Sequence, residues 1–179
     1  MKRSLFVFLL LACSTFQLSA AIYMKFPGID GEATASGHEK EIEIGSINLG
    51  IARAVTAPTG GSSTREASAP TISEISITKM MDISSTLFMM SATAGKGQDN
   101  VVISLTATDK GELFTYCKIT LSNVLVSSYS VSSGGDRPSE SLSLNFTKIQ
   151  VDYYPSVPTG TPPPKVSPFT WDLAAQKSF

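Results

Sequence analysis

Few side chains in this sequence could carry catalysis, and they are scattered along the chain. The only histidine, His38, lies in a polar turn, where we expect it to be exposed to solvent without a partner for metal binding or proton transfer. The two cysteines are Cys13 and Cys117. Cys117 lies on the same side of its predicted strand as Ile119 and Leu121, which predicts a small buried residue on the core face. A nucleophile or an intermolecular disulfide is the alternative, but no histidine is near it in the sequence.

A group of acidic residues is the next candidate for chemistry. It comprises Asp30, Glu32, Glu39, Glu41 and Glu43. The last two alternate with isoleucines, which places them on the solvent face of a strand, and the spacing of a calcium loop is absent. We therefore expect a hydrated strand face, and no metal site.

A glycine-rich turn at 132–138 could in principle hold a phosphate. A phosphate cradle needs a helix directly after the turn. Residues 139–146 instead alternate with a period of two, as a strand does. The sequence thus offers no catalytic, cofactor-binding or metal-binding residues, and we expect no enzyme and no cofactor.

Composition narrows the class of protein further. The 179 residues are 42% apolar, with a formal charge of −1. This is enough for one domain with a sizeable core, and it excludes a chain disordered throughout. Without a basic excess, nucleic acid is not an expected partner.

The N-terminus resembles an export signal. Lys2 and Arg3 precede a short apolar run, and small residues follow it, so we expect a secretory signal peptide at 1–20 with cleavage after Ala20 or Ala21. Removal leaves 12 basic and 15 acidic residues, a net charge of −3. Leu10 to Cys13 also resembles a lipobox, so a lipoprotein anchored through Cys13 is the alternative to a soluble secreted or periplasmic protein. Unless Cys13 is lipidated, we expect no stable membrane insertion.

The mature chain reads mainly as strands. Alternating apolar residues predict strands throughout: 22–26, 41–51, 71–79, 101–107, 113–121, 124–131, 139–146, 149–151 and 169–173. One helix is expected over 82–94, capped by Asp82 or Ser84 and ended by Gly95, with Leu87 and Met90 on its core face. The fold class is mainly β: a compact antiparallel β-barrel or sandwich with one short α-helix.

Three irregular segments interrupt this pattern. The apolar phase slips at Gly45-Ser46, which predicts a β-bulge. Residues 57–69 read as an inserted exposed loop, and the proline-rich stretch 155–168 as a linker before the last strand.

Four blocks, in order, resemble the haemolysin-coregulated protein (Hcp) family of type VI secretion system tube proteins. They are AIYMKFPGIDGE with GHEKEIEI (21–44), ITK through Leu87-Phe88 (77–88), YSVSSGG through Ile149 (129–149) and FTWDL (169–173). The resemblance implies a β-barrel domain over 21–179 that assembles into six-membered rings. It further implies that rings stack into a hollow tube carrying effectors, with no cofactor or catalysis. Three features depart from the family: the export signal, the proline-rich stretch 157–168, and the insertion at 57–69, where the family has a loop used in ring stacking.

One other function stays open. Tyr153, Tyr154 and Trp171 could form an aromatic platform, which would suit an exported β-module for surface or glycan binding. The alternative is that these rings pack in the core or at a subunit contact.

Overall fold

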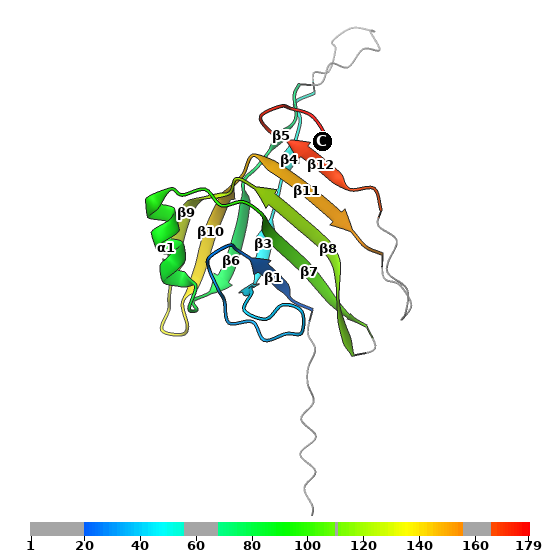
Figure 1. The fold of residues 1–179 in the computed structure, drawn as a ribbon. Helices are drawn as coiled ribbons and strands as arrows, with labels where there is room; N and C mark the ends of the chain where they lie inside the picture. The colour runs from blue at the N-terminus through cyan, green and yellow to red at the C-terminus, as the bar shows by residue number, and fades with distance from the viewer. Residues whose placement is uncertain (1–19, 56–67, 110, 156–165) are drawn as a thin grey trace, which may run out of the picture.

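The structure is a computed structural model that describes residues 20–55, 68–109, 111–155 and 166–179. The chain folds as twelve strands and one helix in these ranges (Figure 1). In order they are β1 (Ile22–Lys25), β2 (Ile42–Ile44), β3 (Ser46–Asn48), β4 (Ile51–Ala52), β5 (Thr71–Ile72), β6 (Ile75–Met80), α1 (Ser85–Ala94), β7 (Val101–Asp109), β8 (Glu112–Ser122), β9 (Leu125–Ser132), β10 (Ser139–Asn145), β11 (Lys148–Tyr153) and β12 (Phe169–Asp172). Nearly all of the expected signal peptide, most of the 57–69 insertion and most of the 155–168 linker lie outside the described residues.

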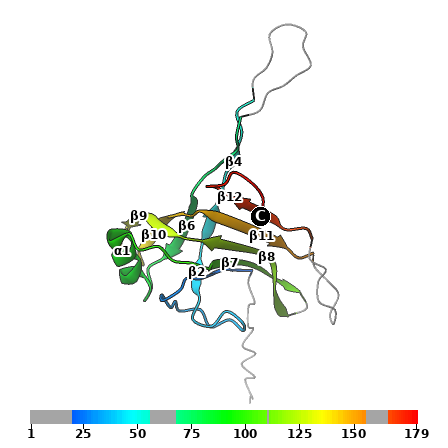
Figure 2. The same ribbon diagram turned by 45° about the horizontal axis from the view of Figure 1, so that its top comes forward.

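The strands form two main antiparallel sheets. One has six strands in the order β12-β11-β8-β7-β1-β2, and the other has four in the order β3-β6-β10-β9. A small third pair, β4 with β5, stands above them (Figures 1 and 2). The predicted fold class, mainly β with one short helix, is confirmed.

The core lies between the two main sheets. Alternate residues of each strand face it and are buried, as the period of two predicts. Examples are Ile42, Ile103 and Leu121 in the six-stranded sheet, and Ile77 and Leu142 in the four-stranded sheet, all 0% exposed. The predicted core parity of the strands is therefore confirmed.

The chain passes from one sheet to the other at Gly45. β2 ends at Ile44 in the six-stranded sheet, and β3 begins at Ser46 in the four-stranded sheet. The Gly45 N–H donates to the Thr78 carbonyl at 2.7 Å, which joins this corner to β6. The β-bulge predicted here is wrong: the apolar phase slips because the chain changes sheets. Ile51, expected to share the core face, is 56% exposed.

The helix α1 has the predicted end but buries a different face. Gly95 adopts a left-handed conformation (φ 63°), which a residue without a Cβ tolerates best, and its N–H donates to the Ser91 carbonyl. The buried residues of α1 are Ser85 and Phe88, and Phe88 meets the Phe26 ring edge-on at 5.2 Å. The predicted core face of Leu87 and Met90 is wrong, because Phe88 is the side chain that reaches into the core.

Candidate functional site

The residues first considered for chemistry do not assemble into a reactive site. In the part of the chain that the structure describes, no three His, Cys, Asp or Glu side chains are grouped so as to hold a metal ion. Cys117 is partly buried against the core, as predicted. Burial, and to a lesser degree the Asp152 carboxylate, raises the pKa of the Cys117 thiol. This disfavours the thiolate that a nucleophile requires.

His38 is not the solvent-exposed residue that the sequence predicted. Its ring stacks on Tyr23 with centroids 4.5 Å apart, and Nδ1 lies 2.7 Å from Glu41 Oε2. The two side chains are only 12% and 16% exposed. Glu41 therefore also departs from its predicted solvent face, because the loop that carries His38 folds over the outer side of β1. Asp30, Glu32, Glu39 and Glu43 are exposed, as expected.

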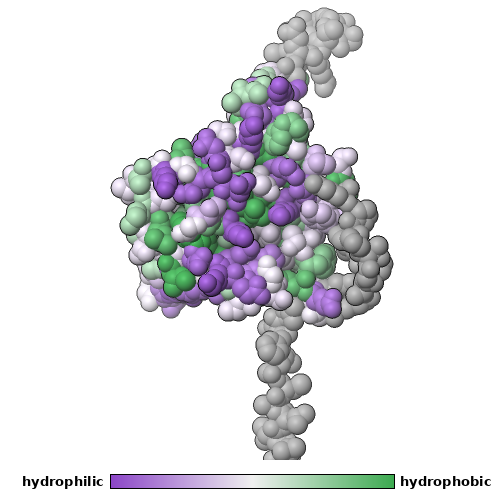
Figure 3. Space-filling model, in the orientation of Figure 1, coloured by the Kyte–Doolittle hydropathy of each residue, from purple (hydrophilic) through white to green (hydrophobic). Residues whose placement is uncertain are grey.

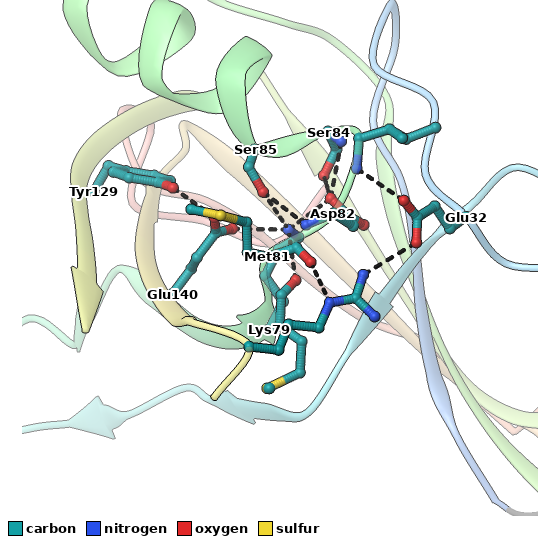
Figure 4. A network of polar contacts seen from close by, with 11 residues as sticks. Glu32, Lys79, Met81, Asp82, Ser84, Ser85, Tyr129 and Glu140 are labelled. Atoms are coloured by element: carbon teal, nitrogen blue, oxygen red, sulfur yellow. Dashed lines mark hydrogen bonds and ion pairs between the residues drawn. The ribbon is translucent and has the colours of Figure 1, made fainter. Parts of the chain in front are cut away.

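A buried ion network that the sequence pattern did not predict lies under the start of α1 (Figure 4). Lys79 on β6 is 1% exposed. Its ammonium lies 2.8 Å from Glu140 Oε2, 2.8 Å from Asp82 Oδ1 and 3.2 Å from Ser85 Oγ. Tyr129 donates its hydroxyl proton to Glu140 Oε1 at 2.6 Å. Strands β6 and β10 and the first turn of α1 thus meet at one cation, and β9 joins them through the bond from Tyr129 to Glu140.

The network holds its carboxylates in the charged form. Burial alone raises the pKa of Glu140, but the hydrogen bonds from Lys79 and Tyr129 outweigh it and lower that pKa below its ordinary value. The pKa of Asp82 is lowered in the same way, with Lys79 and Ser84 overcoming its burial. Burial, followed by the bond to Glu140, raises the pKa of Tyr129, so its hydroxyl remains a donor. Each charged group of the network has hydrogen-bond partners, and the network positions side chains instead of activating one.

A second set of contacts fixes the segment between β6 and α1 from the solvent side. Arg137 Nε donates to the Met81 carbonyl at 2.6 Å, and its Nη2 lies 3.1 Å from Glu32 Oε2. The Ile83 N–H donates to Glu32 Oε1 at 3.2 Å. Glu32 and Arg137 border a cleft of about 270 Å³ beside the buried Lys79. The loop ahead of α1 is therefore held on both sides.

The network had a signal in the sequence. Lys79 continues the alternation of Ile75 and Ile77, and Glu140 precedes Leu142 with the same parity. Both charges consequently occupy core-facing positions, and they are direct partners in the register of β6 and β10. A charge at a core position of each of two strands suggests a buried pair, but only the pairing of the strands brings the two together.

The outer surface of α1 is apolar. Ile83, Leu87, Met89 and Met90, which we call the helix patch, are 59%, 39%, 37% and 66% exposed. Hydrophobic side chains show at the left of the molecule, where α1 lies (Figure 3). None of the ten residues of α1 is charged. An exposed helix normally carries charged residues on its outer face, so this surface is typical of a contact site.

The three aromatic residues proposed as a platform do not all line one pocket. Trp171 lines a pocket with Phe169 and Ile51, whereas Tyr154 lines a depression beside His38. Tyr153 is 51% exposed. No helix among the described residues is long and apolar enough to cross a membrane.

Comparison with known proteins shows similarity to one protein family. The family model described as "Type VI secretion system effector, Hcp" matches residues 23–153. Protein hcp1 of Pseudomonas aeruginosa is 33% identical over 104 residues, which cover 57% of this chain and 64% of that protein. The match thus spans a little under two thirds of the curated relative's length.

Solved structures share the fold over most of the chain. One reported as a type six secretion system protein has a TM-score of 0.78 at 28% identity, and covers 90% of this chain and all of its own. Hcp1 from Salmonella typhimurium has a TM-score of 0.73 at 21% identity, with the same coverage. The second likeness concerns the fold alone.

Proposed function

Because the chain belongs to the Hcp family of type VI secretion system proteins, we propose that it is the structural subunit of a secretion tube. In this proposal six copies close into a ring, rings stack, and the channel carries effector proteins. The observation that carries it is the helix patch, an uncharged and apolar surface that remains exposed in a single copy. A self-assembling subunit needs such a surface. The role requires no catalytic residue and no cofactor.

The buried ion network supports an assembly role. It fixes Ser85, the first residue of α1, against β6 and β10 through Lys79. A surface that is held in place before contact loses less conformational entropy on binding than a mobile one. The network therefore favours association without taking part in it.

The oligomeric state tests the proposal directly. We expect size-exclusion chromatography with light scattering to give six times the protomer mass, and negative-stain microscopy to show rings. Stacks of rings at high concentration would support the tube. A protein that remains monomeric over a wide concentration range would contradict both ring and tube.

We also propose that the chain is exported with residues 1–20 as a cleaved signal. The supporting observations are the pattern at the N-terminus and the position of Ala21, which exchanges hydrogen bonds with Thr106 directly before β1. Mass spectrometry of the protein from the periplasm and the medium should find Ala21 or Ile22 as the first residue. A first residue of Cys13 carrying lipid would instead establish the lipoprotein, and an intact N-terminus would contradict both.

A further inference from the structure

A second apolar surface lies on another side of the molecule, where β12 meets β4 and β5. A pocket of about 300 Å³ opens there, which we call the edge pocket. It is lined by Ile51, Ala52, Arg53, Pro70, Ile72, Phe169 and Trp171. In Figure 1 this region is at the top, whereas α1 lies at the left, so one copy cannot bring the two together.

One residue of the pocket lining, Trp171, carries a buried donor. The indole Nε1 of Trp171 is buried and has no hydrogen-bond partner among the described residues. Trp171 lies beside Phe169 in a lining that is apolar except for Arg53. The pocket therefore suits a flexible apolar side chain that packs well against aromatic rings.

The helix patch supplies a side chain of that kind. Met90 is 66% exposed, the largest exposed fraction among the apolar residues of the patch. Its thioether is flexible, accepts hydrogen bonds weakly and makes favourable contacts with aromatic rings. No charge on α1 would need to be desolvated when the helix enters an apolar site.

We propose that the helix patch of one copy docks into the edge pocket of the next copy, with Met90 entering between Phe169 and Trp171. The contact uses two different surfaces of the same chain, so it is head-to-tail and can close into a ring. This inference rests on the proposed self-assembly and names the surfaces that would carry it.

Cysteine pairs test the contact itself. In a protein with Cys13→Ser and Cys117→Ala, the added pair Met90→Cys and Ile51→Cys should give, on oxidation, covalent multimers up to the full ring. Mixing the two single variants should give covalent dimers only. Dimers formed by Met90→Cys alone would mean that helices face each other, and would overturn the proposal.

Failure of this inference can be told apart from failure of the proposed function. If the wild type forms rings but the variant with the cysteine pair never cross-links, the proposed contact is overturned and the ring itself is not. A wild-type monomer would overturn both.

A charge placed on the apolar surface gives an independent test with an internal probe. Met90→Lys should weaken association at least about tenfold, the effect of one hot-spot residue. Met80→Lys is the matched control, because Met80 is 49% exposed on β6 and lies outside both surfaces. Trp171 is the only tryptophan in the chain, so its fluorescence reports on the edge pocket. Dissociation of the wild type should shift the Trp171 emission to the red. If Met90→Lys and Met80→Lys weakened association equally, the proposal would be overturned.

Discussion

The helix patch and the edge pocket both expose apolar side chains, but the fold supports them by different means. Beneath the helix patch, Lys79 and Glu140 are side chains with 0% exposure, paired at 2.8 Å, and Phe88 is buried in the core. Around the edge pocket, β4 and β5 have two residues each, and β12 pairs with β11 alone among the strands. The helix side rests on buried groups, whereas the pocket side rests on short strands at an edge.

The C-terminal tail adds a second support on the pocket side. Thr170 Oγ1 lies 2.8 Å from Ser178 Oγ and 2.7 Å from the Phe179 carbonyl oxygen, and Lys148 Nζ lies 5.5 Å from the centre of the Phe179 ring. These contacts are exposed. Exposed polar contacts contribute little to stability because water competes for both partners. The apolar helix is therefore presented on a rigid base, and the pocket on a weakly held one.

The largest expected effect comes from removing the buried cation. Lys79→Met should lower the free energy of unfolding by about 3–5 kcal/mol, because it leaves Glu140 and Asp82 as buried charges without their partner. Urea unfolding measures this. The matched control is Lys40→Met, which breaks the exposed Lys40–Asp30 pair at 3.9 Å and should cost at most about 0.5 kcal/mol. Similar losses for the two variants would mean that the network does not stabilise the helix side.

Acid should weaken the helix side more than the pocket side. The folded pKa of Glu140 lies below its ordinary value of 4.5, so its stabilising contribution is present above that value. This contribution is lost as the pH falls through the lowered pKa. A tenfold difference in proton affinity between the folded and unfolded chain corresponds to about 1.4 kcal/mol of stability.

Unfolding free energies measured between pH 7 and pH 3 test this expectation. Glu140→Gln should flatten the pH dependence. Asp172→Asn is the matched control on the pocket side. The pKa of Asp172 is also lowered, by the Ala175 N–H first and Lys148 second, but its partner Lys148 is 47% exposed. An equal flattening by Asp172→Asn would contradict the difference between the two sides.

Local signals were enough to predict most of the strands and the C-terminal end of the helix. Apolar residues at every second position, such as Ile75 and Ile77 or Leu142 and Leu144, indicate which face of a strand is buried, because every second residue points the same way. Gly95 marks the end of α1 because the left-handed conformation there is set within one turn. These features depend on neighbours in the sequence.

The face of the helix and the ion network could not be predicted in this way. Apolar residues lie on more than one side of α1, and the buried side is chosen by Phe26, which comes from a distant loop. The burial of His38 could likewise not be predicted, because Tyr23 and Glu41 cover it only once β1 and the loop have folded together. Each of these errors concerns a contact made by the tertiary structure.

A smaller effect is expected at the C-terminal end of α1. Gly95→Ala should cost about 1–2 kcal/mol, because alanine is strained at a φ of 63°. Nothing lies within 4 Å of the added Cβ, so the cost would come from the backbone alone. The control is Gly134→Ala, which has equally open surroundings and no positive φ, and should stay within about 0.5 kcal/mol of the wild type. Equal unfolding midpoints for the two variants would show that the helix side tolerates a loosened cap.

The smallest expected effect on global stability is at the tail. Thr170→Val keeps the shape of the side chain but removes the hydroxyl that contacts Ser178 and Phe179, and should cost at most about 1 kcal/mol. Hydrogen exchange of the Phe179 amide, which donates to Thr170 Oγ1 at 3.2 Å, should nevertheless accelerate, because the tail can open without unfolding the core. Amides of β10 should exchange at the wild-type rate. If they accelerated together with Phe179, the tail and the buried network would form one cooperative unit. The pocket side would then be as firmly held as the helix side.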